Sequence, residues 1–178
     1  MKKLSIIFLF ILLMLPIGIR AADQFRVGDL VPNFDLPYAT KDTIVFSGIK
    51  NEDLMGKRYV LAFYPADWSP GCTHEMCTFR DEFADFRDLN VEILPISGDY
   101  VFSHHEWAKH HNLNFRLLAD HTRSFGNKMG VYIDDYGMFK RSVFVVGPDG
   151  RFEYIDYEYS LENDQDFRAL RAFLMEKR

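Results

Sequence analysis

Apolar and polar positions along the chain follow two different rhythms. Residues 59–64 (YVLAFY) form a continuous apolar run of strand length between Gly56 and Pro65, a pattern typical of a central buried strand. In residues 73–89, by contrast, the apolar positions recur at spacings of three and four, at Met76, Phe79, Phe83, Phe86 and Leu89. This spacing places them on one stripe, so the segment is predicted to be an amphipathic helix.

The same succession of strand and helix continues toward the C-terminus. The predicted strands are 91–96, 115–119, 142–146 and 152–157, and the predicted helices are 103–111, 122–129 and 166–176. Alternation of this kind indicates parallel βαβ units, whereas the turn residues GPDG before the last strand indicate an antiparallel pair. Residues 25–36, with Gly28 and Pro32, form an extended lead-in. The sequence predicts an α/β fold whose central mixed sheet is flanked by helices and preceded by an N-terminal extension.

The first 22 residues have the pattern of a secretory signal peptide. Two lysines precede an apolar run at 4–15, and Ala21 and Ala22 stand where a peptidase would cut. The run is shorter than the ~20 residues that a bilayer-spanning helix needs. We expect residues 1–22 to be removed, leaving 23–178 as one exported domain, in the periplasm of a bacterium. The alternative is an uncleaved segment that anchors the chain in the membrane.

Composition narrows the classes of partner and cofactor. The 178 residues are 48% hydrophobic with a net charge of −5, which falls to −8 when the three basic residues of the signal are removed. This acidity argues against nucleic acid and against a membrane partner after signal removal. No Gly-rich phosphate loop follows a strand, so no nucleotide cofactor is expected.

Four histidines and two tryptophans invite other interpretations. The histidines His104, His105, His110 and His111 contain no pair at the i, i+4 spacing that would join two imidazoles on one metal, so a solvated helix face is expected. Trp68 and Trp107 are predicted to line the core and a pocket, because the basic groove of a nucleic-acid stacking platform is missing.

The only two cysteines, Cys72 and Cys77, follow the first buried strand, at the end of the sheet where α/β proteins bind ligands. Cys72 stands at the start of a helix, where free N–H groups and the helix dipole favour a thiolate. The alternatives are a structural disulfide of an exported protein and two inert thiols. Residues five apart on a helix have Cα atoms roughly 8 to 9 Å apart, and a disulfide needs less than ~7 Å. A bond between them requires the helix to unwind, which favours a redox pair over a permanent bridge.

The segment FYPADWSPGCTHEMC around these cysteines resembles a peroxiredoxin active site. Pro65, Ser69 and Cys72 fit the family pattern P-x-x-x-[T/S]-x-x-C, and a second cysteine five positions later is similar to the Q-type subgroup, also called bacterioferritin comigratory proteins. Residues 140–146 (KRSVFVV) resemble the strand that carries the family's essential arginine. The resemblance spans roughly residues 25 to 175 and implies a thioredoxin-like fold.

The resemblance implies a thiol peroxidase without metal or organic cofactor. Cys72 would attack a peroxide, hydrogen peroxide or an organic hydroperoxide, and become a sulfenic acid, and Cys77 would resolve it to an intramolecular disulfide. A thioredoxin-like protein would reduce that disulfide. Arg141 would stabilise the thiolate and the departing oxygen, unless it is an ordinary surface arginine of a strand. The chain could be a monomer or a dimer.

Three further residues of the segment have both a catalytic and a structural interpretation. Ser69 either offers its hydroxyl to the thiolate and the peroxide or caps the helix, and its lack of the commoner threonine's methyl loosens its rotamers. Pro65 either shields the sulfur from water or ends the strand. Glu75 either holds Arg141 or faces solvent.

Two other functions use the same thiols. Exported thiol–disulfide exchange proteins of the thioredoxin superfamily carry W-C-x-x-C here, and Ser69 stands where their first cysteine belongs. That difference favours peroxide chemistry, because an exchanger attacks with that cysteine. A redox sensor or chaperone-like binder is the third possibility.

Overall fold

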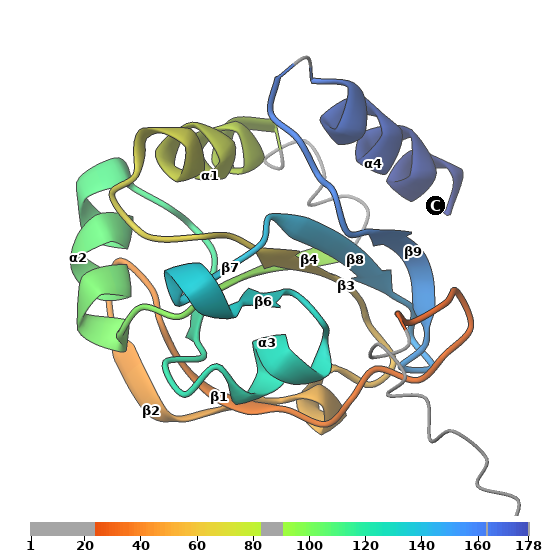
Figure 1. Cartoon of the computed structure of the whole chain (residues 1–178), viewed down its shortest axis with the longest axis horizontal. Coiled ribbons are helices and arrows are strands. Elements are labelled where there is room, and N and C mark those ends of the chain that lie inside the picture. The colour runs from red at the N-terminus through yellow and green to blue at the C-terminus, as the bar shows by residue number, and fades with distance from the viewer. Residues whose placement is uncertain (1–23, 83–90, 163, 178) are drawn as a thin grey trace, which may run out of the picture.

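The computed structural model describes residues 24–82, 91–162 and 164–177, and in this part a seven-stranded sheet forms the centre of the protein (Figure 1). The strand order is β2-β1-β5-β4-β3-β8-β9. The strands are β1 (Asp35–Ala39), β2 (Ile44–Lys50), β3 (Arg58–Phe63), β4 (Val91–Ser97), β5 (Leu117–Ala119), β8 (Ser142–Val146) and β9 (Phe152–Asp156). A separate pair consists of β6 (Tyr132–Ile133) and β7 (Met138–Phe139).

Strand β3 lies in the interior of the sheet, as the apolar run predicts. It pairs in parallel with β4 and antiparallel with β8, so the sheet is mixed. Its side chains alternate between two apolar clusters: Val60 and Ala62 belong to the one that contains Cys72, whereas Tyr59 and Leu61 belong to the other. Both faces of β3 are therefore buried, which accounts for its continuous apolar sequence.

Helices cover both faces of the sheet (Figure 1). The helices are α1 (Pro70–Glu82), α2 (Val101–His111), α3 (Ser124–Lys128) and α4 (Gln165–Glu176), and short 3-10 turns occupy Asn51–Leu54 and Asp134–Tyr136. Helices α1 and α4 lie above the sheet in Figure 1, and α3 lies on the opposite side. Leu170 of α4 packs in the same cluster as Cys72, while Phe125 of α3 packs in the other.

Most predicted elements form; helix α2 begins two residues earlier than predicted, and the pair of β6 and β7 is not predicted. Three further differences concern the other elements. Strands β1 and β2 make an antiparallel hairpin that the sequence does not predict as strands. Strand β5 and helix α3 are shorter than the predicted segments 115–119 and 122–129. Helix α1 begins at Pro70, three residues earlier than predicted, and its predicted continuation to Leu89, like the predicted signal peptide, lies outside the described residues.

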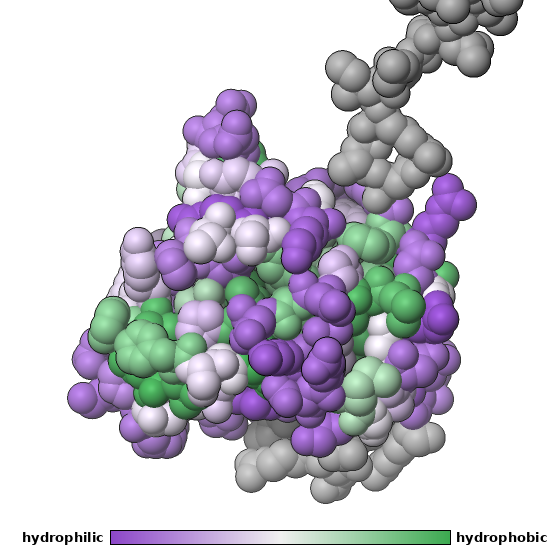
Figure 2. Space-filling view, turned by 90° about the horizontal axis from the view of Figure 1, so that it is seen from below, coloured by the Kyte–Doolittle hydropathy of each residue, from purple (hydrophilic) through white to green (hydrophobic). Residues whose placement is uncertain are grey.

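The surface carries an apolar region beside β2 and α2, at the left of the view in Figure 2. Phe46 of β2 and Phe102 of α2 are 67% and 61% exposed, and their ring centroids lie 6.0 Å apart. In the described part of the chain, no helix combines the length and apolarity needed to cross a membrane.

Candidate active site

Cys72 lies in the first turn of α1, just beyond the carboxyl end of β3. Its backbone N–H donates to Ser69 Oγ at 3.3 Å, and the N–H of Thr73 donates to the Ser69 carbonyl oxygen at 2.9 Å. Ser69 therefore occupies the position of a helix cap, and Cys72 lies at the positive end of the helix dipole. Cys72 is only 1% exposed, so its side chain is almost fully buried.

Arg141, which directly precedes β8, contacts the sulfur. Its Nη2 lies 3.5 Å from Cys72 Sγ, while its Nη1 donates to the Glu75 carboxylate. The planar guanidinium thus presents one edge to the carboxylate and another nitrogen to the thiol. A fixed positive charge therefore lies beside the sulfur.

Glu75 is buried rather than solvated, since its side chain is 1% exposed, against 17% for its partner Arg141. A carboxylate this deeply buried needs a charged partner, and the guanidinium supplies it. Its Oε1 has no hydrogen-bond partner in the described part of the chain. The geometry agrees with the interpretation in which Glu75 holds Arg141, and does not agree with a solvated surface acid.

Pro65 stands where the ladder of β3 ends. Tyr64 still donates its N–H to the Ile96 carbonyl oxygen at 3.1 Å, and Pro65 has no N–H to continue the pairing. The residue is half-buried. The strand-ending role is therefore visible, and the shielding role stays a prediction.

Cys77 is half-buried and lies in the same continuous helix as Cys72, and both thiols are free. A structural disulfide between them would need α1 to begin after Cys77, whereas α1 begins at Pro70. Arg80 lies next to Cys77, and its pKa is raised chiefly by the hydrogen bond with Asp81 and to a smaller extent by the Cys77 sulfur. Joining the two thiols requires the helix between them to unwind.

The comparison with known proteins agrees with this geometry. The family described as AhpC/TSA matches residues 27–155, which include Cys72, Cys77, Glu75 and Arg141. The chain belongs to the AhpC/TSA family. The chain is therefore a thiol peroxidase of the peroxiredoxin type, and the disulfide-exchange alternative is not favoured.

Several relatives of the chain have names that contain the word peroxiredoxin. The chain is 31% identical to a putative peroxiredoxin in the rubredoxin operon of Clostridium pasteurianum, over 83% of this chain and 88% of that protein. It is 37% identical to chloroplastic peroxiredoxin Q of Triticum aestivum, over 72% of this chain and only 57% of that protein. For the putative peroxiredoxin bcp of Coxiella burnetii, the identity is 34%, over 71% and 85%. These relatives support the Q-type subgroup.

Solved peroxiredoxins share the fold. Peroxidoxin BcpB of Mycobacterium tuberculosis superposes with a TM-score of 0.75 at 28% identity, covering 87% of this chain and 99% of that one. AhpC of Enterococcus faecalis superposes with a TM-score of 0.76 at 22% identity, covering 85% and 92%. The second likeness concerns the fold alone. Together they confirm the predicted thioredoxin-like architecture.

Sequence reasoning missed a buried polar cluster beside this peroxiredoxin site. His104 was expected on a solvated helix face, but it is fully buried and bonds to Asp67, which lies in the loop between β3 and α1. Trp68 was expected in the core or a pocket lining and is instead 51% exposed, while Trp107 is buried as predicted. Residue spacing cannot signal the Asp67–His104 pair, because 37 positions separate the two residues.

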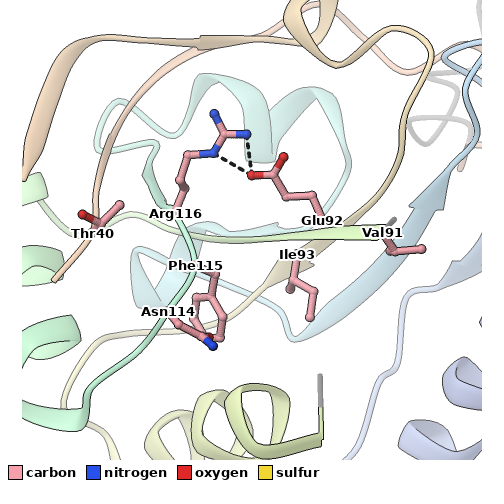
Figure 3. Close-up of a pocket in the computed structure, with 7 residues that line it drawn as sticks. All are labelled: Thr40, Val91, Glu92, Ile93, Asn114, Phe115 and Arg116. Atoms are coloured by element: carbon pink, nitrogen blue, oxygen red, sulfur yellow. Dashed lines mark hydrogen bonds and ion pairs between the residues drawn. The ribbon is translucent and has the colours of Figure 1, made fainter. Parts of the chain in front are cut away.

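A cavity with a volume of about 340 Å³ lies beside the start of β4 and the segment before β5 (Figure 3). Its wall includes Arg116, whose Nε lies 2.6 Å from Glu92 Oε1. Its lining residues include none of the predicted site residues, so the cavity is not part of the thiol site. Among the described residues, no group of three or more metal-ligating side chains is present.

Proposed function

We propose that this peroxiredoxin reduces hydrogen peroxide and organic hydroperoxides at Cys72. The observation that carries the proposal is the contact of Arg141 Nη2 with Cys72 Sγ, in a guanidinium whose other edge is held by buried Glu75. This arrangement supplies a fixed positive charge at the place where a peroxide oxygen would gain negative charge. The helix N-terminus acts in the same direction.

In the first step the Cys72 thiolate attacks one peroxide oxygen. A sulfur–oxygen bond forms and the oxygen–oxygen bond breaks, so sulfur is oxidised and the peroxide is reduced by two electrons. The departing oxygen leaves as water or an alcohol after taking up one proton, and the attacked oxygen stays on sulfur as a sulfenic acid. Arg141 stabilises the charge on the departing oxygen, and Ser69 holds the start of the helix that carries the sulfur.

In the second step the Cys77 thiol attacks the sulfenic sulfur of Cys72. A disulfide forms, and the sulfenic oxygen leaves as water together with the thiol proton. Because both residues lie in α1, this step takes place only after part of the helix has unwound. A thioredoxin-like dithiol then reduces the disulfide: it gives up two electrons and two protons and becomes a disulfide itself.

We also propose that the protein acts outside the cytoplasm, since residues 1–22 have the pattern of an export signal. Fractionation of the native host, with the mass of the mature chain, tests this proposal. A mature chain that begins near residue 23 in the exported fraction is expected. Full-length protein in the cytoplasm would refute it.

The test of the peroxidase is a single turnover of the reduced protein with one equivalent of hydrogen peroxide, followed by stopped flow and mass spectrometry. The Cys72→Ser variant retains only Cys77 and supplies the rate of an ordinary protein thiol as an internal baseline. We expect wild-type Cys72 to react far above that baseline. A wild-type rate equal to the baseline would sink the proposal.

The resolving step has its own variant. Cys77→Ser is expected to keep the fast first attack and to accumulate the Cys72 sulfenic acid, which a dimedone adduct reveals by mass. Steady-state turnover with a dithiol protein as the reductant should then fail. Undiminished turnover in this variant would show that a thiol other than Cys77 resolves the sulfenic acid.

A further inference from the structure

Asp67 lies at the centre of a buried polar network behind the thiol site. Its side chain is 1% exposed, and its carboxylate accepts three hydrogen bonds. The donors are Tyr64 Oη at 2.8 Å, Ser103 Oγ at 2.7 Å and His104 Nδ1 at 2.8 Å. A carboxylate away from water is tolerated only with such partners. The proposed chemistry of Cys72 uses none of these groups directly.

His104 joins the network with both ring nitrogens. Its Nδ1 faces the Asp67 carboxylate, and its Nε2 lies 3.2 Å from the Leu118 carbonyl oxygen. The carboxylate and the carbonyl are both acceptors, so each ring nitrogen of His104 faces a hydrogen-bond acceptor. This pair connects the loop after β3 to α2 and to β5.

The backbone of Asp67 is held as firmly as its side chain. Its N–H donates to Asp99 Oδ2 at 2.8 Å, and the same oxygen accepts from Ser97 Oγ, at the end of β4, at 2.9 Å. None of these partners lies in α1. The start of α1 is thus held by contacts that come from outside the helix.

The residue after Asp67 has a strained backbone. Trp68 has a φ of 62°, in the left-handed region that is unfavourable for a residue with a side chain. Its Nε1 donates to Ser103 Oγ at 3.2 Å, the same hydroxyl that donates to Asp67. This turn leads directly into Ser69, whose oxygen atoms cap α1. The network therefore fixes a strained turn that sets where α1 begins.

We propose that Asp67 is a positioning residue for Cys72, a latch that favours the wound form of α1 over the unwound form. The proposal rests on the peroxidase cycle proposed above, in which the wound helix attacks peroxide and the unwound helix forms the disulfide. A weaker latch lowers the population of the first form and raises that of the second. The two steps must then change in opposite directions, whereas a general loss of stability has no reason to separate them.

The main test uses Asp67→Asn, because asparagine has one acceptor oxygen where the carboxylate has two and cannot satisfy all three donors. If the bias of about one buried hydrogen bond is lost, we expect the ratio of the rate constant for disulfide formation to that for Cys72 oxidation by peroxide to rise about tenfold. Most of this change should appear as faster disulfide formation, because the wound form predominates. Without peroxide, alkylation of buried Cys72 by iodoacetamide, followed by peptide mass spectrometry, should become faster.

A variant with a smaller change to the network and a control variant complete the test of Asp67→Asn. Ser103→Ala removes one donor to Asp67 and the acceptor of Trp68 Nε1, and it serves if Asp67→Asn does not fold. Leu54→Ala makes a cavity in the apolar cluster that does not contain Cys72, so it lowers thermal stability without touching the latch. We expect Leu54→Ala to leave the ratio of the two rates unchanged.

The outcomes separate the latch from the peroxidase. A rise in the ratio of disulfide formation to peroxide attack, with faster alkylation, supports the latch. Rates that fall together, or alkylation and rates that stay at wild-type values in a folded variant, overturn it even if wild-type Cys72 reacts rapidly with peroxide. A wild-type protein no faster than Cys72→Ser instead overturns the peroxidase, and the alkylation rates still decide whether Asp67 holds the wound helix.

Discussion

Arg141 Nη2 lies 3.5 Å from Cys72 Sγ, although 69 positions separate the two residues in the sequence. The contact exists because β8 pairs antiparallel with β3, so the start of β8 lies next to the end of β3. Ser142 is paired with Phe63, so Arg141 lies at the end of β3 from which the chain continues into α1. Sheet topology and the start of α1 together bring the guanidinium to the sulfur.

Replacing Arg141 by glutamine should lower the rate constant for peroxide attack by about 10²- to 10³-fold, the usual loss for one preorganised donor at a developing charge. The Arg141→Lys variant keeps the positive charge but loses the planar guanidinium, so its rate constant should lie between those of the wild type and of Arg141→Gln. Stopped-flow oxidation of the reduced protein measures all three. Arg151→Gln, at the opposite end of the sheet, is the matched control, and an equal loss there would contradict the assignment.

Glu75 and Arg141 should act as a unit. Glu75→Gln removes the buried charge and is expected to cost about 1 to 3 kcal/mol of unfolding free energy, since partial exposure of Arg141 screens the pair. It should also slow peroxide attack, because the guanidinium loses its anchor. In the double variant with Arg141→Gln, the rate should match that of Arg141→Gln alone. Additive losses in this cycle would mean that the two residues act independently.

The role of Ser69 as a helix cap can be distinguished from a role of its hydroxyl in the reaction. Ser69→Ala should lower the unfolding free energy by about 1 kcal/mol and slow peroxide attack. Ser69→Thr keeps the hydroxyl and restricts its rotamers, so it should preserve stability and equal or exceed the wild-type rate. Chemical denaturation and stopped flow give the two quantities. A Ser69→Ala protein with lower stability but a wild-type rate would restrict Ser69 to the structural role.

Stability should fall in strongly alkaline solution because several tyrosines are held neutral. Burial raises the pKa of Tyr154 to about 12, assisted by the charges of Asp156 and Asp166. Burial also raises the pKa values of Tyr59 and Tyr159. The unfolded chain ionises near pH 10, so this contribution is complete below pH 10 and is lost as the pH rises through about 12.

Denaturation at a series of pH values, with tyrosine absorbance followed in parallel, measures this effect. Tyr154→Phe should flatten the decline between pH 10 and 12, because one group with a raised pKa is removed. Tyr136→Phe, at a side chain that is 72% exposed, is the control and should leave the decline as it is in the wild type. Equal slopes in both variants would contradict the assignment to Tyr154.

The parts of the fold that the sequence predicts are those with strong local patterns. The apolar run of β3 and the turn between β8 and β9 need no distant partner to be recognised, and both form. The hairpin of β1 and β2 was missed because β2 is an edge strand with a largely exposed sequence, and a bulge near Tyr38 interrupts its pairing. Its strand state depends on pairing with the rest of the sheet.

The residues of the candidate site also differ in whether the sequence predicts them. The motif predicts which residues surround Cys72, and the structure brings Ser69, Glu75 and Arg141 to it. The motif does not indicate that Asp67 is buried or that His104 is its partner. A histidine on a helix has the same sequence signal whether it faces solvent or a polar core. Only the packing of α2 against the loop distinguishes the two.

The unequal burial of the two sulfurs has a consequence for which molecules can reach each of them. Cys72 is 1% exposed and Cys77 is half-buried. While α1 is wound, burial should therefore shield Cys72 from bulky oxidants, such as the disulfide of another protein, more than from a small peroxide. Cys77 is shielded less, so the two sulfurs should differ in the size of the molecules that can reach them.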